Sequence, residues 1–192
     1  MVKNNTYKHS SIYNDIIDRN MSQFLKDNKI FKVTVKKMLL IGRQYTVKDK
    51  KELMRIINKS VKIFGNECDL NWVDTSQITD MSCLFYDMTK FNGHIEKWDV
   101  SNVKDMTGMF EKASSFNQLL NNWDVSNVKK MQYMFAKTYS FNQPIGDWDV
   151  SNVKDMNYMF AYAETFNQTL NKWDVSNVKN MSDMFKYAFS FN

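Results

Sequence analysis

The 192-residue chain has few of the residues that usually build tight turns or chemical sites: five glycines, one proline, two cysteines and two histidines. Cys68 and Cys83 lack the paired spacing of a disulfide framework or a zinc site. His9 and His94 also have no partner at metal-ligand spacing. We therefore expect no metal site, no cofactor and a reducing or cysteine-indifferent compartment.

Long apolar runs and catalytic motifs are missing as well. No run approaches the roughly 18 apolar residues of a membrane span. The polar start, residues 1–9, has no apolar segment of the kind found in secretory signals. No Gly-x-Ser-x-Gly motif, phosphate-binding loop or pair of catalytic carboxylates is present. The sequence thus predicts no membrane span, no enzyme activity and, as read, a cytoplasmic protein.

Charge is unevenly distributed along the chain. Residues 1–65 carry 15 Lys and Arg against 5 Asp and Glu, a net charge of +10, whereas residues 66–192 carry 11 against 16, a net charge of −5. A basic N-terminal module of this kind can bind nucleic acid or anionic lipid. Because no nucleic-acid motif accompanies the charge, we favour a solvated cap and regard nucleic acid as the less favoured partner.

A 25-residue unit recurs through the second half of the chain. The segment 98–106, WDVSNVKDM, returns with small changes at 123–131, 148–156 and 173–181. Each copy is followed at fixed distances by a Met-Phe pair and a Phe-Asn pair, and a degenerate copy spans 73–81. Such a period indicates stacked units that bury faces a single unit cannot bury.

The spacing inside each unit predicts a short strand followed by a short helix. The Trp-Asp-Val start alternates as a strand does, with Asp pointing outward. Met106, Met109, Phe110 and Ala113 have the i, i+3, i+4, i+7 spacing of a buried helical stripe. The fold class predicted is an α/β solenoid of short parallel strands and short helices. Its expected core residues are Trp98, Trp123, Trp148, Trp173, Met106, Met131, Met156, Met181, Phe110, Phe135, Phe160 and Phe185.

Three segments precede or make up this array. Residues 1–44 form a basic helix and strand segment, residues 45–72 a β-α-β entry cap, and residues 73–192 about four and a half repeats. Within the first two, apolar patterns predict a helix over 11–26 and a strand over 31–35. A helix beginning at Asp49 then lies between strands over 45–47 and 61–64.

Two repeated surface columns are candidate binding sites. The Asp column could hold a cation or a basic ligand, although we favour solvation and hydrogen bonds to nearby Ser, Asn and Lys side chains as its explanation. The tyrosines beside the Met-Phe pairs could form an exposed aromatic ridge, a feature typical of protein interfaces, unless stacking between units alone explains them. The candidate residues are Asp99, Asp124, Asp149, Asp174, Tyr133, Tyr158, Tyr162 and Tyr187.

The unit 148–156, followed by Met159-Phe160 and Phe166-Asn167, resembles the repeat of the BspA-type leucine-rich-repeat surface proteins. These are bacterial proteins, and the repeat is also known as a mycoplasma-type domain of unknown function. Residues 45–64 resemble the entry unit that precedes such arrays. The resemblance implies a right-handed, leucine-rich-repeat-like coil, a cell-surface location, and adhesion or partner binding for some members. It brings no catalytic residues.

These observations together predict a non-enzymatic repeat scaffold that binds a protein or glycan partner. The alternative is an intracellular adaptor whose basic N-terminal module binds nucleic acid or an anionic membrane. The last unit, 173–188, is as regular as the inner ones and has no polar cap. We therefore also expect end-to-end self-association through this unit, or a longer array of which the chain is a part.

Overall fold

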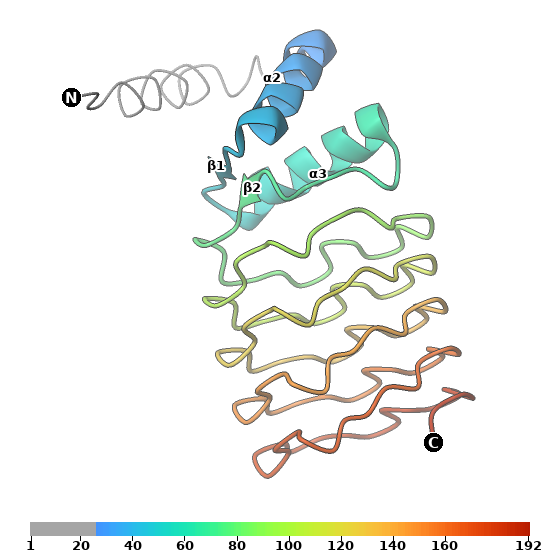
Figure 1. Ribbon diagram of the computed structural model, residues 1–192. Helices are drawn as coiled ribbons and strands as arrows, with labels where there is room; N and C mark the ends of the chain where they lie inside the picture. The colour runs from blue at the N-terminus through green and yellow to red at the C-terminus, as the bar shows by residue number, and fades with distance from the viewer. Residues whose placement is uncertain (1–25) are drawn as a thin grey trace, which may run out of the picture.

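A computed structural model describes residues 26–192 of the protein (Figure 1). From Asp27 onward its regular elements are helix α2 (Asn28–Ile41), strand β1 (Tyr45–Thr46), helix α3 (Lys50–Phe64) and strand β2 (Val73–Asp74). The two strands pair in parallel, with Tyr45 opposite Val73. The helix expected over 11–26 lies, apart from its last residue, outside the described residues.

Each cap helix is preceded by an aspartate and followed by a glycine. The side chains of Asp27 and Asp49 accept hydrogen bonds from backbone N–H groups in the first turns of α2 and α3, at 2.8 to 3.0 Å. These N-caps satisfy donors that have no partner inside the helix. Gly42 and Gly65 follow the two helices with φ of 64° and 89°, conformations that glycine adopts without a steric penalty.

The cap is more helical than the sequence predicted. The strand expected over 31–35 is wrong, because these residues lie inside α2 and its buried face is Phe31, Val35 and Met38. The strand expected over 61–64 is also wrong, because it forms the last turn of α3. Apolar residues that alternate over a short run can equally be spaced i, i+4, i+7 on a helix. The second strand of the β-α-β unit is β2, at the entry to the repeats.

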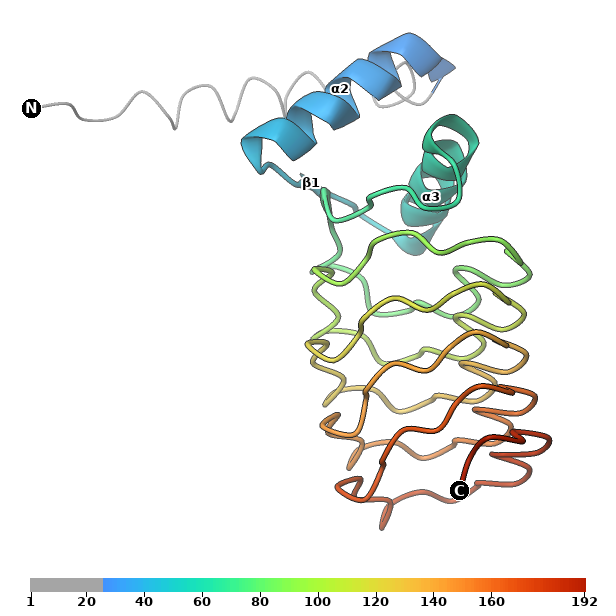
Figure 2. The same ribbon diagram turned by 45° about the vertical axis from the view of Figure 1, so that its right-hand side comes forward.

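Each repeat forms one layer of a stack that runs from α3 to the C-terminal end (Figures 1 and 2). Regular secondary structure in residues 75–192 is limited to isolated parallel bridges between single residues. The predicted α/β solenoid of repeated short strands and short helices is therefore wrong, as is its leucine-rich-repeat-like form. The layers are built from turns and loops. Bridges between successive layers join Asp80, Asp105, Lys130, Asp155 and Asn180 in that order.

Consecutive tight turns take the place of the expected helix. In the layer that starts at residue 98, the N–H groups of Met109, Glu111 and Ala113 each donate to the carbonyl three residues earlier, at 2.9 to 3.1 Å. The third residues of the first and last of these turns, Gly108 and Lys112, have φ of 59° and 63°, as type II turns require. Such turns bring apolar side chains inward every three or four residues. Their hydrophobic spacing is therefore the same as that of a helix.

The Trp-Asp-Val segments likewise do not pair as strands. The backbone on both sides of the segment is engaged in turns: the N–H groups of Trp98 and Val103 each donate to the carbonyl three residues earlier, at 3.0 and 2.9 Å. The layers are joined elsewhere, where the N–H of Met106 donates to the carbonyl of Lys130 in the next layer at 2.9 Å. Equivalent bonds recur at this position between the other repeats.

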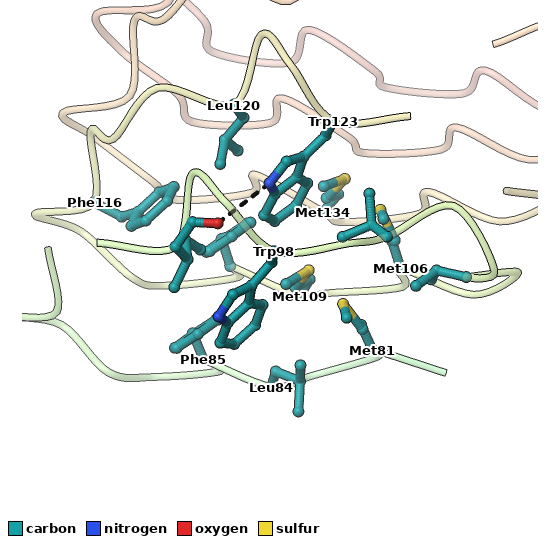
Figure 3. Packing of buried hydrophobic residues seen from close by; sticks show 14 of the residues in the cluster. Met81, Leu84, Phe85, Trp98, Met106, Met109, Phe116, Leu120, Trp123 and Met134 are labelled. Atoms are coloured by element: carbon teal, nitrogen blue, oxygen red, sulfur yellow. Dashed lines mark hydrogen bonds between the residues drawn. The ribbon is translucent and has the colours of Figure 1, made fainter. Parts of the chain in front are cut away.

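Identical side chains stack on one another to fill the interior. The ring of Phe110 stacks on that of Phe135 in the next layer, with centroids 5.5 Å apart and planes within 6°. Figure 3 shows Trp98 and Trp123 in the same orientation, with the indole N–H of Trp123 donating to the carbonyl of Ile95 at 3.3 Å. The inner layers bury the following side chains to 4% exposure or less: Trp98, Trp123, Trp148, Met106, Met131, Met156, Phe110, Phe135 and Phe160.

The last layer is less buried than the inner ones because it lies at the end of the stack. Met181 is 42% exposed, and Trp173 and Phe185 are half-buried. The indole N–H of Trp173 nevertheless donates to the carbonyl of Ile145 at 3.0 Å, the same bond that the tryptophans of the inner layers make. End-to-end association through this layer stays a prediction.

Candidate binding surfaces

The Asp column lies exposed along one side of the stack, and its carboxylates are engaged in local turns. Each accepts a hydrogen bond at 3.0 Å from the backbone N–H of the serine two residues later, an arrangement known as an Asx turn. In Asp149 the hydrogen bonds from Ser151 lower the pKa of the carboxyl, although the neighbouring charge of Asp174 acts in the opposite direction. The column comprises Asp99, Asp124, Asp149 and Asp174.

The Asp column therefore has a structural role that needs no ligand. Within residues 26–192, no group of three or more His, Cys, Asp or Glu side chains is arranged to hold a metal ion. The serine N–H bonds also compensate part of the negative charge, because a carboxylate that accepts such bonds is stabilised in its ionised form. Nothing else about the column points to a specific ligand.

Amide side chains join the layers next to this column. The Nδ2 group of Asn102 donates to the carbonyl of Ser76 in the preceding layer at 2.9 Å, and the next three repeats make the same bond. A second set begins where the N–H of Asn117 donates to Oδ1 of Asn92 at 3.0 Å. These amides satisfy backbone groups of adjacent layers, so we regard them as structural.

The four tyrosines form two stacked pairs, each between successive layers. The rings of Tyr133 and Tyr158 are 5.0 Å apart and nearly parallel, and those of Tyr162 and Tyr187 are 4.8 Å apart and tilted by 35°. Tyr133 and Tyr187 are 36% and 48% exposed, and the other two are half-buried. The structure therefore brings all four predicted tyrosines to the surface as neighbours across layers.

Lysines connect and flank these pairs. The Nζ atom of Lys186 lies 5.9 Å from the ring centroids of both Tyr158 and Tyr187, and Nζ of Lys137 lies 5.4 Å from that of Tyr162. These are cation–π distances. Sequence reasoning had identified the tyrosines but missed the lysines, as well as Phe189, which is 77% exposed and 6.0 Å from the Tyr187 ring. We call the four tyrosines, Phe189, Lys137 and Lys186 the aromatic ridge.

The tyrosines of the ridge have an unusual backbone conformation. All four have positive φ, between 55° and 60°. A bulky residue in the left-handed region is a strained outlier, and the penalty is about 1 to 3 kcal/mol. The equivalent turn positions of the other layers hold Gly108, Asp87 and Asp183, which suit this conformation better, and also Cys83, Lys112 and Lys137, which do not. The positive φ is therefore a property of the turn in every layer and is not confined to the tyrosines.

Comparison with known families places the repeats in one of them. Residues 51–150 and 120–192 match a family described as "Mycoplasma protein of unknown function, DUF285". The chain belongs to this family. The two matches extend from α3 to the last layer and so cover part of the cap as well as the repeats. Searches of curated proteins and of solved structures found no match. No described helix is both long enough and apolar enough to cross a membrane.

Proposed function

We propose that this protein is a non-enzymatic repeat scaffold that binds a protein or glycan partner through the aromatic ridge. The observation that carries the proposal is the gathering of four stacked, surface tyrosines with Phe189, Lys137 and Lys186 in successive layers. Tyrosine is also enriched at protein interfaces, where it supplies a large contact area at a small loss of conformational entropy.

A protein is the better fit of the two partner classes. Tyr133 and Tyr158 stack face to face, which leaves ring edges and hydroxyl groups, more than open ring faces, to a ligand. A hydrogen bond to the Asp183 carboxylate raises the pKa of Tyr158, so this hydroxyl already has a partner within the ridge. A sugar that packs flat on an aromatic ring needs an open face, whereas a protein surface can use edges, hydroxyls and flanking lysines together.

The resemblance of the repeat to those of BspA-type surface proteins supports partner binding, because adhesion or partner binding is a role of some of those proteins. The Asp column is the competing surface on this scaffold. It is a weaker candidate because Asx turns already account for its carboxylates. The alternative function, an adaptor with a basic docking module, rests on a different surface, the exposed side of α2.

A pair of variants separates the two surfaces of the repeats. In one, Tyr133, Tyr158, Tyr162 and Tyr187 are all replaced by Ser; in the other, Asp99, Asp124, Asp149 and Asp174 are all replaced by Asn. Both change four residues of the repeats, and the Asn side chains can still accept the Asx-turn bonds. Each variant and the wild type would be immobilised and exposed to cell extracts and to a glycan array, and thermal melts would establish that all three are folded.

We expect a ligand that binds the wild type and the Asp variant but not the Tyr variant. Loss of the ligand from the Asp variant alone would move the binding surface to the Asp column. Binding to all three proteins, or to none, would contradict a role for the ridge. Turnover of any array compound by the wild type would contradict the non-enzymatic part of the proposal.

A further inference from the structure

Helix α2 exposes an apolar stripe on the side opposite its buried face. Its members are 45% to 85% exposed: Ile30, Val33, Leu40 and Ile41. The spacing i, i+3, i+10, i+11 places them along one side of the helix. Figures 1 and 2 show α2 as the outermost helix, at the end of the stack farthest from the last layer. The stripe is therefore presented at one pole of the described molecule.

Lysines run along one edge of this stripe. Lys29, Lys32 and Lys36 are all exposed, and at 100° per residue they lie on the side of α2 next to the apolar stripe. Among the described residues, none of the three forms an ion pair. A further exposed lysine, Lys37, falls within the stripe, between Val33 and Ile41. An apolar stripe bordered by lysines is the arrangement of helices that lie in the plane of a membrane interface.

The charge around α2 is strongly positive and only slightly compensated. Residues 26–64 contain 12 Lys and Arg and 3 Asp and Glu, a net charge of +9. All three acidic side chains are occupied: Asp27 and Asp49 cap helices, and Glu52 accepts hydrogen bonds from the Tyr45 hydroxyl and the Lys48 N–H, both at 2.8 Å. The exposed residues Lys51, Arg55 and Lys62 of α3 extend the positive surface.

We propose that α2 docks the protein on an anionic lipid bilayer, with the apolar stripe in the interfacial region and the lysines at the lipid headgroups. Anionic leaflets attract such basic segments, and apolar side chains on the same face add burial. Nucleic acid would satisfy the lysines, but it would leave Val33 and Leu40, 60% and 85% exposed, without an apolar partner. A bilayer satisfies both parts of the surface.

This orientation is compatible with the proposed function but does not depend on it. The stack extends from α3 away from α2 (Figure 2), and the aromatic ridge belongs to layers in its C-terminal half. A bilayer at α2 therefore leaves the ridge accessible to a partner. Failure of the ridge experiment would leave membrane docking intact, because the two surfaces share no residue.

Co-sedimentation of the full chain with vesicles tests the proposal. Phosphatidylcholine vesicles would be compared with vesicles that also contain phosphatidylserine. One variant carries Lys29→Gln, Lys32→Gln and Lys36→Gln, and its control carries the same three changes at exposed lysines of the repeats, Lys104, Lys129 and Lys154. A second variant carries Val33→Ser and Leu40→Ser, and its control carries Leu119→Ser and Val175→Ser, at repeat positions that are 51% and 37% exposed.

We expect binding to the phosphatidylserine vesicles, weakened on the order of a hundredfold by the three changes in α2, since each lysine near an anionic surface contributes about fivefold. The loss of Val33 and Leu40 should weaken binding about tenfold. Both repeat controls should bind within about twofold of the wild type, apart from the general effect of net charge, and added salt should release the protein.

Three results would overturn the proposal. The first is absence of binding to phosphatidylserine vesicles, which would leave a protein as the partner of the stripe. The second is an equal effect of the two triple-lysine variants, which would mean that net charge alone attracts the protein. The third is binding of a DNA or RNA duplex that competes with the vesicles and is unaffected by Val33→Ser and Leu40→Ser. Because all substituted side chains are exposed, melting temperatures should establish that each variant is folded.

Discussion

The cap and the repeats differ in the residue types that adopt a positive φ. In the cap, both residues with positive φ are glycines, Gly42 and Gly65, one after each helix. In the repeats, nine of the ten described positions with positive φ carry other residues, and Gly108 is the exception. The scarcity of glycine in this chain therefore does not mean a scarcity of tight turns. The repeats instead form their turns with residues for which a positive φ is unfavourable.

The hydrogen bonds of the stack explain why the repeats tolerate this strain. The N–H of Tyr133 donates to the carbonyl of Asn157 in the next layer at 3.0 Å, and that of Lys137 donates to Ala161 at 2.7 Å. The equivalent positive-φ residues of the other layers before the last do the same. A strained conformation persists where the surrounding structure over-determines it. In the cap only the local helix end fixes the backbone, and glycine is used.

The largest expected effect tests stacking in the interior of the repeats. Trp148→Ala should lower the free energy of unfolding by about 3 to 5 kcal/mol, because it removes a buried ring and the indole bond to the Leu120 carbonyl at 3.0 Å. Trp173→Ala, in the half-buried last layer, should lower it by about 1 to 2 kcal/mol. Urea denaturation measures both. Equal losses would mean that the inner layers gain nothing from being covered on both sides.

A second prediction compares a ladder bond of the repeats with a helix cap. Oδ1 of Asn142 accepts bonds from the Asn167 N–H and from Nε2 of Gln168, both at 2.9 Å. Asn142→Ala leaves the Asn167 N–H unpaired, whereas Gln168 keeps its second bond, to the Asn142 carbonyl at 3.1 Å; the variant should destabilise the protein by about 1 to 3 kcal/mol. Asp49→Ala removes the N-cap of α3 and should cost about 1 kcal/mol. The comparison fails if chemical denaturation ranks the cap variant as the less stable of the two.

The repeat architecture could be predicted from the sequence only in part. The 25-residue period identifies a repeat protein, because near-identical units must occupy near-identical environments. The conformation inside the unit could not be predicted, since Met109, Phe110 and Ala113 point inward with the same spacing in successive turns as in a helix. Only the positive φ of Gly108 and Lys112 distinguishes the two, and lysine gives no signal of that conformation.

The candidate surfaces show a similar limit. The recurrence of tyrosine beside the Met-Phe pairs was visible in the sequence, but the conformational strain at Tyr133 and Tyr158 was not. Lys186 could not be connected to the ridge from its position in the chain, because its contact with Tyr158 crosses from one layer to the next. Contacts of this kind depend on how the turns aim each side chain.

A third, smaller effect concerns an ion pair between two layers. Burial raises the pKa of Asp105, but hydrogen bonds from Thr107 and from Lys130, whose Nζ is 3.0 Å away, outweigh it and lower the pKa. The stabilisation from a lowered carboxyl pKa is fully present above the ordinary value of about 3.9 and is lost as pH falls through the folded-state value. Asp105→Asn should therefore cost at most about 1 kcal/mol at neutral pH.

The pH dependence identifies the source of that cost. Denaturation curves of wild type and Asp105→Asn should converge as pH falls below about 4, because protonation removes the same charge in the wild type. Asp124→Asn is the control, since its exposed carboxylate takes only the Ser126 N–H within its own layer. A difference between Asp105→Asn and wild type that persists at low pH would mean that packing, and not the ion pair with Lys130, is responsible.

The smallest expected effect tests the contrast between cap and repeats most directly, because it predicts a change of sign. Lys137 has φ of 59° and Lys129, an exposed lysine of the same repeat, does not have positive φ. Lys137→Gly removes a left-handed penalty of about 1 kcal/mol or more. It also removes the cation–π contact with Tyr162 at 5.4 Å and gives the unfolded chain more freedom. The net result should be a gain in stability of about 0.5 kcal/mol. Lys129→Gly should instead lower stability by about 0.5 to 1 kcal/mol. Paired thermal melts resolve a difference of this size, and a loss at both positions would mean that the stacked layers hold lysine at positive φ without strain.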